Sequence, residues 1–201
     1  MPRTEEQFEQ IRKEKKQIIM DVALELFAKN GFHVTSISQI AKQAGISKGL
    51  AYNYFKSKND ILEEIIKSGF GEISNLMIPP YDGSITDDEF ITFLEHSFDK
   101  VGNDIQHWKL FYSLMLQPNI VENFTERYAA AAEPFFSMMH QFITSKGSAD
   151  PEGDLMIISA MIEGAFLYAV VASGIFPHQQ MKQKVIDGVF RIIETGKKQQ
   201  S

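Results

Sequence analysis

The sequence predicts an all-α protein, and three observations lead to that fold class. Apolar residues recur at intervals of three and four along nearly every periodic segment, which is helical spacing and not the alternation of a strand. Ser36 and Thr86 are each followed three residues later by Gln or Glu, the arrangement of a helical capping box. Glycine and proline separate the periodic segments. We therefore expect a group of short amino-terminal helices followed by a larger helical part.

Four helices are expected in the first 77 residues. Ile18, Val22 and Leu26 are spaced by four and give the first of them an apolar stripe. The two glycines that follow the first and second helices are typical C-terminal stops. The first helix is expected to end before Gly31, and the second to run from Ser36 to Gly45. The third is expected to be capped by Ser47, and the fourth to run from Ser57 or Asn59 toward Met77.

The rest of the chain also has helical periodicity. The clearest break is PPYDGS, residues 79–84, and KGSADPEGD, residues 146–154, is expected to be a loop. Five helices are expected here. The first begins at Thr86, the second runs from Asp104 to Pro118, and the third runs from Asn119 to about Ser145 with a kink at Pro134. The fourth covers 155–172, and the last is an amphipathic helix from about Gln179 to Thr195.

Composition places limits on the cellular setting. The 201 residues include no cysteine, and the charged amino terminus lacks the apolar core of a signal peptide. We therefore expect an intracellular, cytoplasmic protein. Residues 155–172 approach membrane-spanning length, but Glu163 lies at their centre, where a charge in lipid would be costly. A buried helix and no membrane partner are the expectation.

Charge is distributed unevenly along the chain. The net charge is −6, yet residues 1–60 contain 10 Lys and Arg against 7 Asp and Glu. The segment Leu26–Asn59 contains five lysines and no carboxylate. This asymmetry favours a small anion-facing module attached to an acidic body.

The second and third expected helices are separated only by AGIS, which predicts a helix-turn-helix. Gly45 can adopt the left-handed conformation that the turn requires. At the start of the third helix, Lys48 adds a positive charge to the free backbone N–H groups, and Gly49 has no side chain to obstruct a phosphate. Tyr52 and Asn53 are expected to face outward, where asparagine can pair with adenine in the major groove.

These residues resemble a known family. TSISQIAKQAGISKGLAYNYFKSKNDIL (35–62) and ALELFAKNGF (23–32) are similar to the signature of TetR-type transcriptional regulators, and the resemblance covers about residues 13–73. It implies an amino-terminal helix-turn-helix DNA-binding domain, 13–73, and a helical effector-binding and dimerisation domain, 74–201. By position it implies DNA contacts from Ser36, Ser38, Ser47, Lys48, Gly49, Tyr52, Asn53, Tyr54 and Lys58.

One departure concerns the middle of the third helix. The family usually has a larger apolar residue at position 51, where this chain has Ala51, and position 50 is often polar. Leu50 either packs inward in compensation or contacts a thymine methyl group.

The resemblance also implies a repressor that binds a pseudo-palindromic operator as a homodimer and is released by a small, largely apolar effector. The last two helices would form the dimer interface, through small residues of 155–172 such as Gly164, Ala165 and Ala169 and through the apolar face of the last helix with Ile186, Val189, Phe190 and Ile193. The candidate effector-binding residues are Trp108, Phe111, Tyr112, Met115, Phe135, Met139 and Glu163.

Most of these aromatic and methionine side chains are also compatible with an ordinary core. Glu163 is the most specific of them, since a buried carboxylate needs a partner, which could be an effector group or a lysine or tyrosine of a second subunit.

Two other functions fit the sequence less well. A helical enzyme is disfavoured because the five histidines lack metal-ligand spacing and no nucleophile motif is present, so we expect no catalytic residue, metal or cofactor. An architectural DNA-binding protein without an effector would have weak sequence preference and no ligand cavity.

Overall fold

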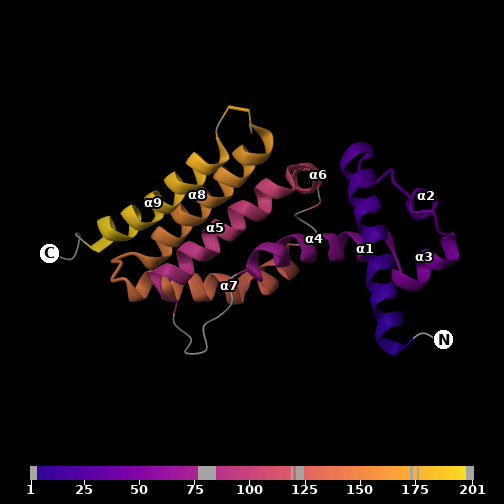
Figure 1. Cartoon of the computed structure of the whole chain (residues 1–201), viewed down its shortest axis with the longest axis horizontal. Helices are drawn as coiled ribbons and strands as arrows, with labels where there is room; N and C mark the ends of the chain where they lie inside the picture. The colour runs from indigo at the N-terminus through magenta and orange to yellow at the C-terminus, as the bar shows by residue number, and fades with distance from the viewer. Residues whose placement is uncertain are drawn as a thin grey trace. The chain divides into compact units, whose positions relative to one another are not determined.

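A computed structural model of the chain describes residues 4–76, 85–118, 120, 125–172, 174, 175 and 177–197. Over these residues it is all-helical, as expected, with no strand (Figure 1). The helices are α1 (Glu5–Asn30), α2 (Ile37–Gln43), α3 (Lys48–Tyr54), α4 (Lys58–Ser74), α5 (Asp87–Asn103), α6 (Ile105–Met115), α7 (Thr125–Ser145), α8 (Pro151–Val171) and α9 (His178–Lys197). The predicted break at 79–84 and the predicted ends at Met77 and Asn119 lie outside the described residues.

The chain forms two compact units. The first unit comprises Met1–Gly69 and Leu110–Thr125, and the second unit comprises Phe70–Lys109 and Glu126–Ser201. Two of the three boundaries therefore fall within α4 and α6 and the third lies at the start of α7, whereas the sequence placed a single boundary after residue 73. The second half of α6 belongs with the amino-terminal helices.

Helices α1 to α4 form the core of the first unit. In Figure 1, α2 and α3 lie beside α1, and α2 packs against both α1 and α3. Phe27, Ile40, Ile61 and Leu62 are fully buried. Two glycines at turns have positive φ, Gly31 (95°) after α1 and Gly45 (68°) between α2 and α3, so these turns form as the sequence predicted.

The predicted helix caps are confirmed. The capping boxes of Ser36 with Gln39 and of Thr86 with Glu89 are both complete, and the Ser47 hydroxyl accepts the backbone N–H of Leu50 at 3.1 Å. Asp104 caps α6 by accepting the His107 backbone N–H. A further capping box begins α1 at Thr4, well before the part of the chain that resembles known regulators.

Aromatic packing holds the second unit together. Helices α5, α8 and α9 pack against one another and lie side by side in Figure 1. Phe90 of α5 lies against Phe142 of α7 and Phe190 of α9, with ring centroids 4.7 and 6.2 Å apart. Phe98 contacts Phe166 of α8 at 4.8 Å. An ion pair between Lys182 and Asp99 further joins α9 to α5.

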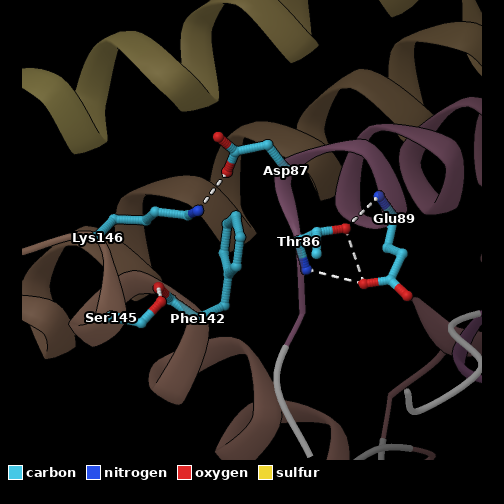
Figure 2. Close-up of polar contacts among 6 residues, drawn as sticks. All are labelled: Thr86, Asp87, Glu89, Phe142, Ser145 and Lys146. Atoms are coloured by element: carbon cyan, nitrogen blue, oxygen red, sulfur yellow. Dashed lines mark hydrogen bonds and ion pairs between the residues drawn. The ribbon is translucent and has the colours of Figure 1, made fainter. Parts of the chain in front are cut away.

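The end of α7 is fastened to the beginning of α5. Figure 2 shows the Lys146 ammonium group reaching the Asp87 carboxylate, 2.6 Å away, beside the capping box of Thr86 and Glu89. The same ammonium group lies 5.0 Å from the centre of the Phe142 ring. These contacts join the end of α7 to the beginning of α5, next to the aromatic core of the second unit.

Helix α8 differs from the prediction of a buried helix. By length and composition it alone among the described helices could cross a membrane, but only 28% of its apolar window is buried. Ala165 and Ala169 are buried inside the unit, as are Ile186, Val189 and Ile193 of α9. The predicted interface residues therefore lie mostly in the unit's own core, and Glu163, expected to be buried, is exposed.

Candidate nucleic-acid interface

Helix α3 has one buried face and one exposed face. Ala51 is 1% exposed, and Phe55, which follows the helix, is also buried. The residues predicted to face DNA lie on the other side: Ser47, Lys48, Gly49, Tyr52 and Asn53 are exposed and Tyr54 is half-buried. Nearly all polar and aromatic side chains of this helix therefore face outward. The helix packs against the rest of the first unit through the small side chain of Ala51.

Neither the backbone conformation nor the packing inside the protein requires glycine at position 49. The φ of Gly49 is not in the left-handed region, and a Cβ built at this position would meet no atom within 4 Å. Alanine would therefore fit both the backbone and the packing, and would favour a helix more. The missing side chain leaves the backbone at this end of α3 open to a molecule that approaches from outside.

The position of Leu50 separates the two sequence interpretations. The residue keeps 38% of its accessible surface, and it is Ala51 that packs into the core. Leu50 therefore does not fill the space left by the small residue at position 51. An apolar group remains exposed beside Lys48 and Gly49.

The serines have different positions. The hydroxyls of Ser36 and Ser47 accept the backbone N–H groups of Gln39 and Leu50, so both begin helices. Ser38 is exposed on α2. An outside phosphate would have to share Ser36 and Ser47 with their capping bonds, whereas Ser38 has no such role.

The lysines of the acid-free segment also differ. Lys42, Lys48 and Lys56 are exposed, and the Lys48 ammonium lies 6.0 Å from the centre of the Tyr52 ring. The Lys58 ammonium instead donates to the carbonyls of Phe32 and His33 at 2.7 and 2.9 Å, and burial lowers its pKa. Two of its three protons are thus used inside the protein. The phosphate contact predicted for Lys58 would depend on the third.

Both carboxylates that flank the acid-free segment are held by neighbouring donors. Glu25 bonds to Lys29 at 2.7 Å and to Gln43, and these contacts lower its pKa. Asp60 accepts from the Ser57 hydroxyl at 2.6 Å and from the Lys56 backbone, and its pKa is lowered as well. Each of the two carboxylates is therefore hydrogen-bonded to groups of its own neighbourhood, Glu25 beside α2 and Asp60 at the start of α4.

The predicted effector-binding residues divide between the units. Phe111, Tyr112 and Met115 belong to the first unit, and Trp108, Phe135, Met139 and Glu163 to the second. In the second unit Trp108 and Met139 are buried, and the Phe135 ring lies 5.6 Å from that of Phe93. Such contacts are those of a core. Glu163 is exposed on α8, so of its two predicted partners, an effector group or a residue of a second subunit, the exposed position fits the second.

Over the residues that the structure describes, no group of three His, Asp or Glu side chains is placed to hold a metal ion. Sequence reasoning overlooked Gln117, whose side chain bonds to the backbone at the end of α1 in the first unit. No local pattern reveals this contact, since its partners precede it by 85 and 90 residues.

Comparison with known proteins agrees with this arrangement. Residues 19–65 match the family described as "Bacterial regulatory proteins, tetR family". The "Fatty acid metabolism regulator protein" of Bacillus subtilis is 46% identical over 59 residues, which are 29% of this chain and 30% of that protein. The regulator AcrR of Shigella flexneri is 44% identical over 63 residues, 30% of this chain and 29% of that one. The chain thus matches less than a third of these relatives' length.

Solved structures share the fold over most of their length. The regulator FadR of Bacillus subtilis, in complex with stearoyl-CoA, superimposes with a TM-score of 0.69 at 21% identity, covering 86% of this chain and 96% of that one. The SmeT–triclosan complex gives a TM-score of 0.71 at 20% identity, with coverage of 88% and 90%. At these identities the likeness is one of fold.

Proposed function

We propose that this chain is a cytoplasmic repressor of the tetR family of bacterial regulatory proteins, whose model its residues 19–65 match. It binds operator DNA as a homodimer and leaves it when a small molecule binds the second unit. The observation that carries the proposal is the exposed face of α3, where an open glycine lies between a lysine and two outward polar or aromatic side chains.

DNA binding follows from the chemistry of that face. The cap on Ser47 uses the N–H of Leu50, and by helix geometry the N–H groups of Lys48 and Gly49 are left to an outside acceptor such as a phosphate. Asn53 and Tyr52 then reach toward base edges, and Leu50 supplies an apolar contact for a thymine methyl. Phosphate contacts provide affinity and these side chains provide sequence preference.

Homodimer formation is supported by the exposed side of α8. Ile157, Ala160, Gly164, Tyr168 and Val171 follow one another at intervals of three and four and share one stripe of the helix. The two β-branched residues and the tyrosine are 57%, 63% and 52% exposed, and such a patch is unusual on a monomer. A dimer that reads a pseudo-palindromic operator presents its two recognition helices one turn of DNA apart, about 34 Å.

An apolar effector is supported by composition and by the relatives. The second unit is rich in aromatic side chains, which line apolar ligand sites in other proteins. One relative is a fatty acid regulator, and two proteins of the same fold were solved with stearoyl-CoA and with triclosan. We infer that the effector is a long-chain acyl compound or an aromatic one. It must bind more tightly to the conformation that cannot span the operator.

The test begins with the selection of a binding site from random duplex DNA, followed by fluorescence anisotropy at several salt concentrations. We expect affinity to fall steeply with salt, with a slope about one smaller for Lys48→Ala. Tyr52→Ala should weaken binding without loss of helical content. Stearoyl-CoA and triclosan are then added to the complex, and release by either supports the effector step. Selection of no sequence by the wild-type protein would refute the proposal.

A further inference from the structure

The beginning of α1 extends beyond the core of the first unit. Over residues 5–15 every side chain is exposed except that of Ile11, which is half-buried, and the first buried residue of the helix is Ile19. Lys16 marks the place where the helix meets the rest of the unit, because its ammonium group pairs with the Glu64 carboxylate of α4 at 2.6 Å. We refer to residues 5–15 as the α1 extension.

The α1 extension is helical although it contributes no buried side chain. The capping box of Thr4 and Gln7 begins it, and the Gln10 side chain donates to the Glu14 carboxylate one turn further on. Local bonds of this kind are weak, and isolated helices shorter than about 12–15 residues are marginal in water. Most helical stability in proteins comes instead from the packing of an apolar face. Such a face is present on the extension.

The apolar face consists of a narrow stripe along one side of α1. Phe8, Ile11, Lys15 and Ile18 follow one another at intervals of three and four, which is the spacing of the contact positions in a coiled coil. Phe8 is 58% exposed and Ile18 is 42% exposed. The hydrocarbon stem of Lys15 can cover apolar surface while its charge stays in water. The stripe therefore has the width of a contact with one other helix.

The charges of this segment make it complementary to a second copy of itself. Residues 5–11 carry three glutamates and no base, whereas residues 12–16 carry four bases and one acid. Two copies in antiparallel orientation bring each acidic end against the basic end of the other, and a parallel pair would bring like charges together. When Phe8 packs on Ile11 of the other copy, heptad geometry places Glu5 beside Arg12 at both ends of the contact.

We propose that the α1 extension is a self-association surface through which two repressor dimers on neighbouring operators contact each other. The pairing is antiparallel and two-fold, so each copy offers the same patch to the other. Where it concerns DNA, this inference rests on the proposed function. A contact of this size is weak between free molecules, but two dimers on one DNA meet at a high effective concentration. The contact then appears as cooperative binding.

The experiment compares DNA with one selected operator and DNA with two, separated by spacers that vary over about two helical turns, roughly 20 base pairs. Glu5→Arg and Arg12→Glu each place like charges opposite one another, and the double variant exchanges the two charges. Glu6→Arg and Lys13→Glu are the matched controls, because they make the same charge changes on the opposite side of the helix. Helical content and dimerisation are checked first.

We expect the second wild-type dimer to bind about tenfold more tightly than the first at the favourable spacing, a modest part of the 10²–10⁴-fold that linkage can supply. Glu5→Arg and Arg12→Glu should each abolish this gain, and the double variant should restore it, because opposite charges again face each other. The gain should persist in Glu6→Arg and Lys13→Glu. The ratio of the two affinities on one DNA removes the general effect of charge on DNA binding.

Two results overturn the inference while the proposed function stands. One is equal affinity of the wild-type protein for both operators at every spacing. The other is failure of the double variant to regain what the single variants lose. If the wild-type protein binds no operator, the proposed function fails, and sedimentation at high protein concentration decides the contact separately. Association of dimers into tetramers that Arg12→Glu weakens and Lys13→Glu does not would support it, and its absence would overturn it.

Discussion

Gly69 of α4 lies directly against the ring of Phe111 of α6, with no room for a side chain between them. A Cβ at position 69 would lie 2.3 Å from Cε2 of Phe111 and 2.6 Å from Cζ. The ring is 4% exposed and belongs, like Gly69, to the first unit. Glycine is therefore required here by the close approach of two helices.

Gly69→Ala should destabilise the protein by about 1–3 kcal/mol, because the ring must move within a packed core. Gly71→Ala is the control, since its Cβ would meet only Asn75 Nδ2 at 3.4 Å, and it should be neutral or slightly stabilising. Urea unfolding measures both. Phe111→Leu should restore part of the loss in the Gly69→Ala background, and strict additivity of the two changes would contradict the contact.

Gly49→Ala should separate stability from DNA binding. The new methyl meets nothing inside the protein, so unfolding in urea should be unchanged or more difficult by up to about 1 kcal/mol. Operator affinity should fall at least severalfold, because the methyl occupies space that a phosphate would use. Unchanged affinity would mean that DNA does not approach this end of α3.

Lys58→Met should destabilise the fold, because the part-buried carbonyl of Phe32 and the exposed carbonyl of His33 lose a charged donor; such bonds are worth about 1.5–3 kcal/mol at most, and less where water can replace the donor. Chemical unfolding gives the stability, and operator binding is measured well below the unfolding transition. Loss of affinity larger than that of Lys48→Ala, without loss of stability, would favour the phosphate role that the sequence suggested.

Asp60→Asn should produce a stability difference that depends on pH. The Ser57 hydroxyl lowers the pKa of Asp60 in the folded state, so the ionised form is favoured by folding. Its contribution is complete above the unfolded pKa, about 3.9, and is lost as pH falls through the lower folded pKa. The gap between wild type and variant should be constant near pH 7 and shrink below about pH 4. A gap that grew with acidification would have the wrong sign.

Ile157→Glu should prevent dimerisation, because it replaces the first large apolar side chain of the exposed stripe on α8 with a charge. Analytical ultracentrifugation should show a monomer with normal helical content, and operator affinity should approach that of a half-site. Gln106→Glu, at an exposed position of α6, adds the same charge and should remain dimeric. A monomeric wild type would contradict the proposed pairing of α8.

The sequence predicted much of the fold because the relevant signals are local. The helix caps at Ser36, Ser47 and Thr86 and the turn at Gly45 depend on residues within a few positions of one another. The same is true of the exposed face of α3, whose periodicity distinguishes Ala51 from its neighbours. Local chemistry was therefore enough to predict which side chains of α3 are exposed.

The errors arose where burial depends on distant parts of the chain. The apolar pattern of α8 runs around the whole helix, so periodicity could not show that Ile157 and Tyr168 face outward while Ala165 faces inward. Glu163 was judged buried for the same reason. Neither the roles of Gln117 and Lys58 nor the membership of 110–125 in the first unit has a local signature, because each depends on packing between remote segments.

The division of α6 between the units has a practical consequence for chimeric regulators. A graft that takes residues 1–73 and joins them to a foreign carboxyl-terminal half carries the whole face of α3 but leaves Gln117 behind. The donor module would then lack the two hydrogen bonds that Gln117 makes at the end of α1, to the backbone of Phe27 and Phe32. Exchanges that carry Leu110–Thr125 together with the amino-terminal helices keep the module whole, so that new effector specificities could be combined with an existing operator.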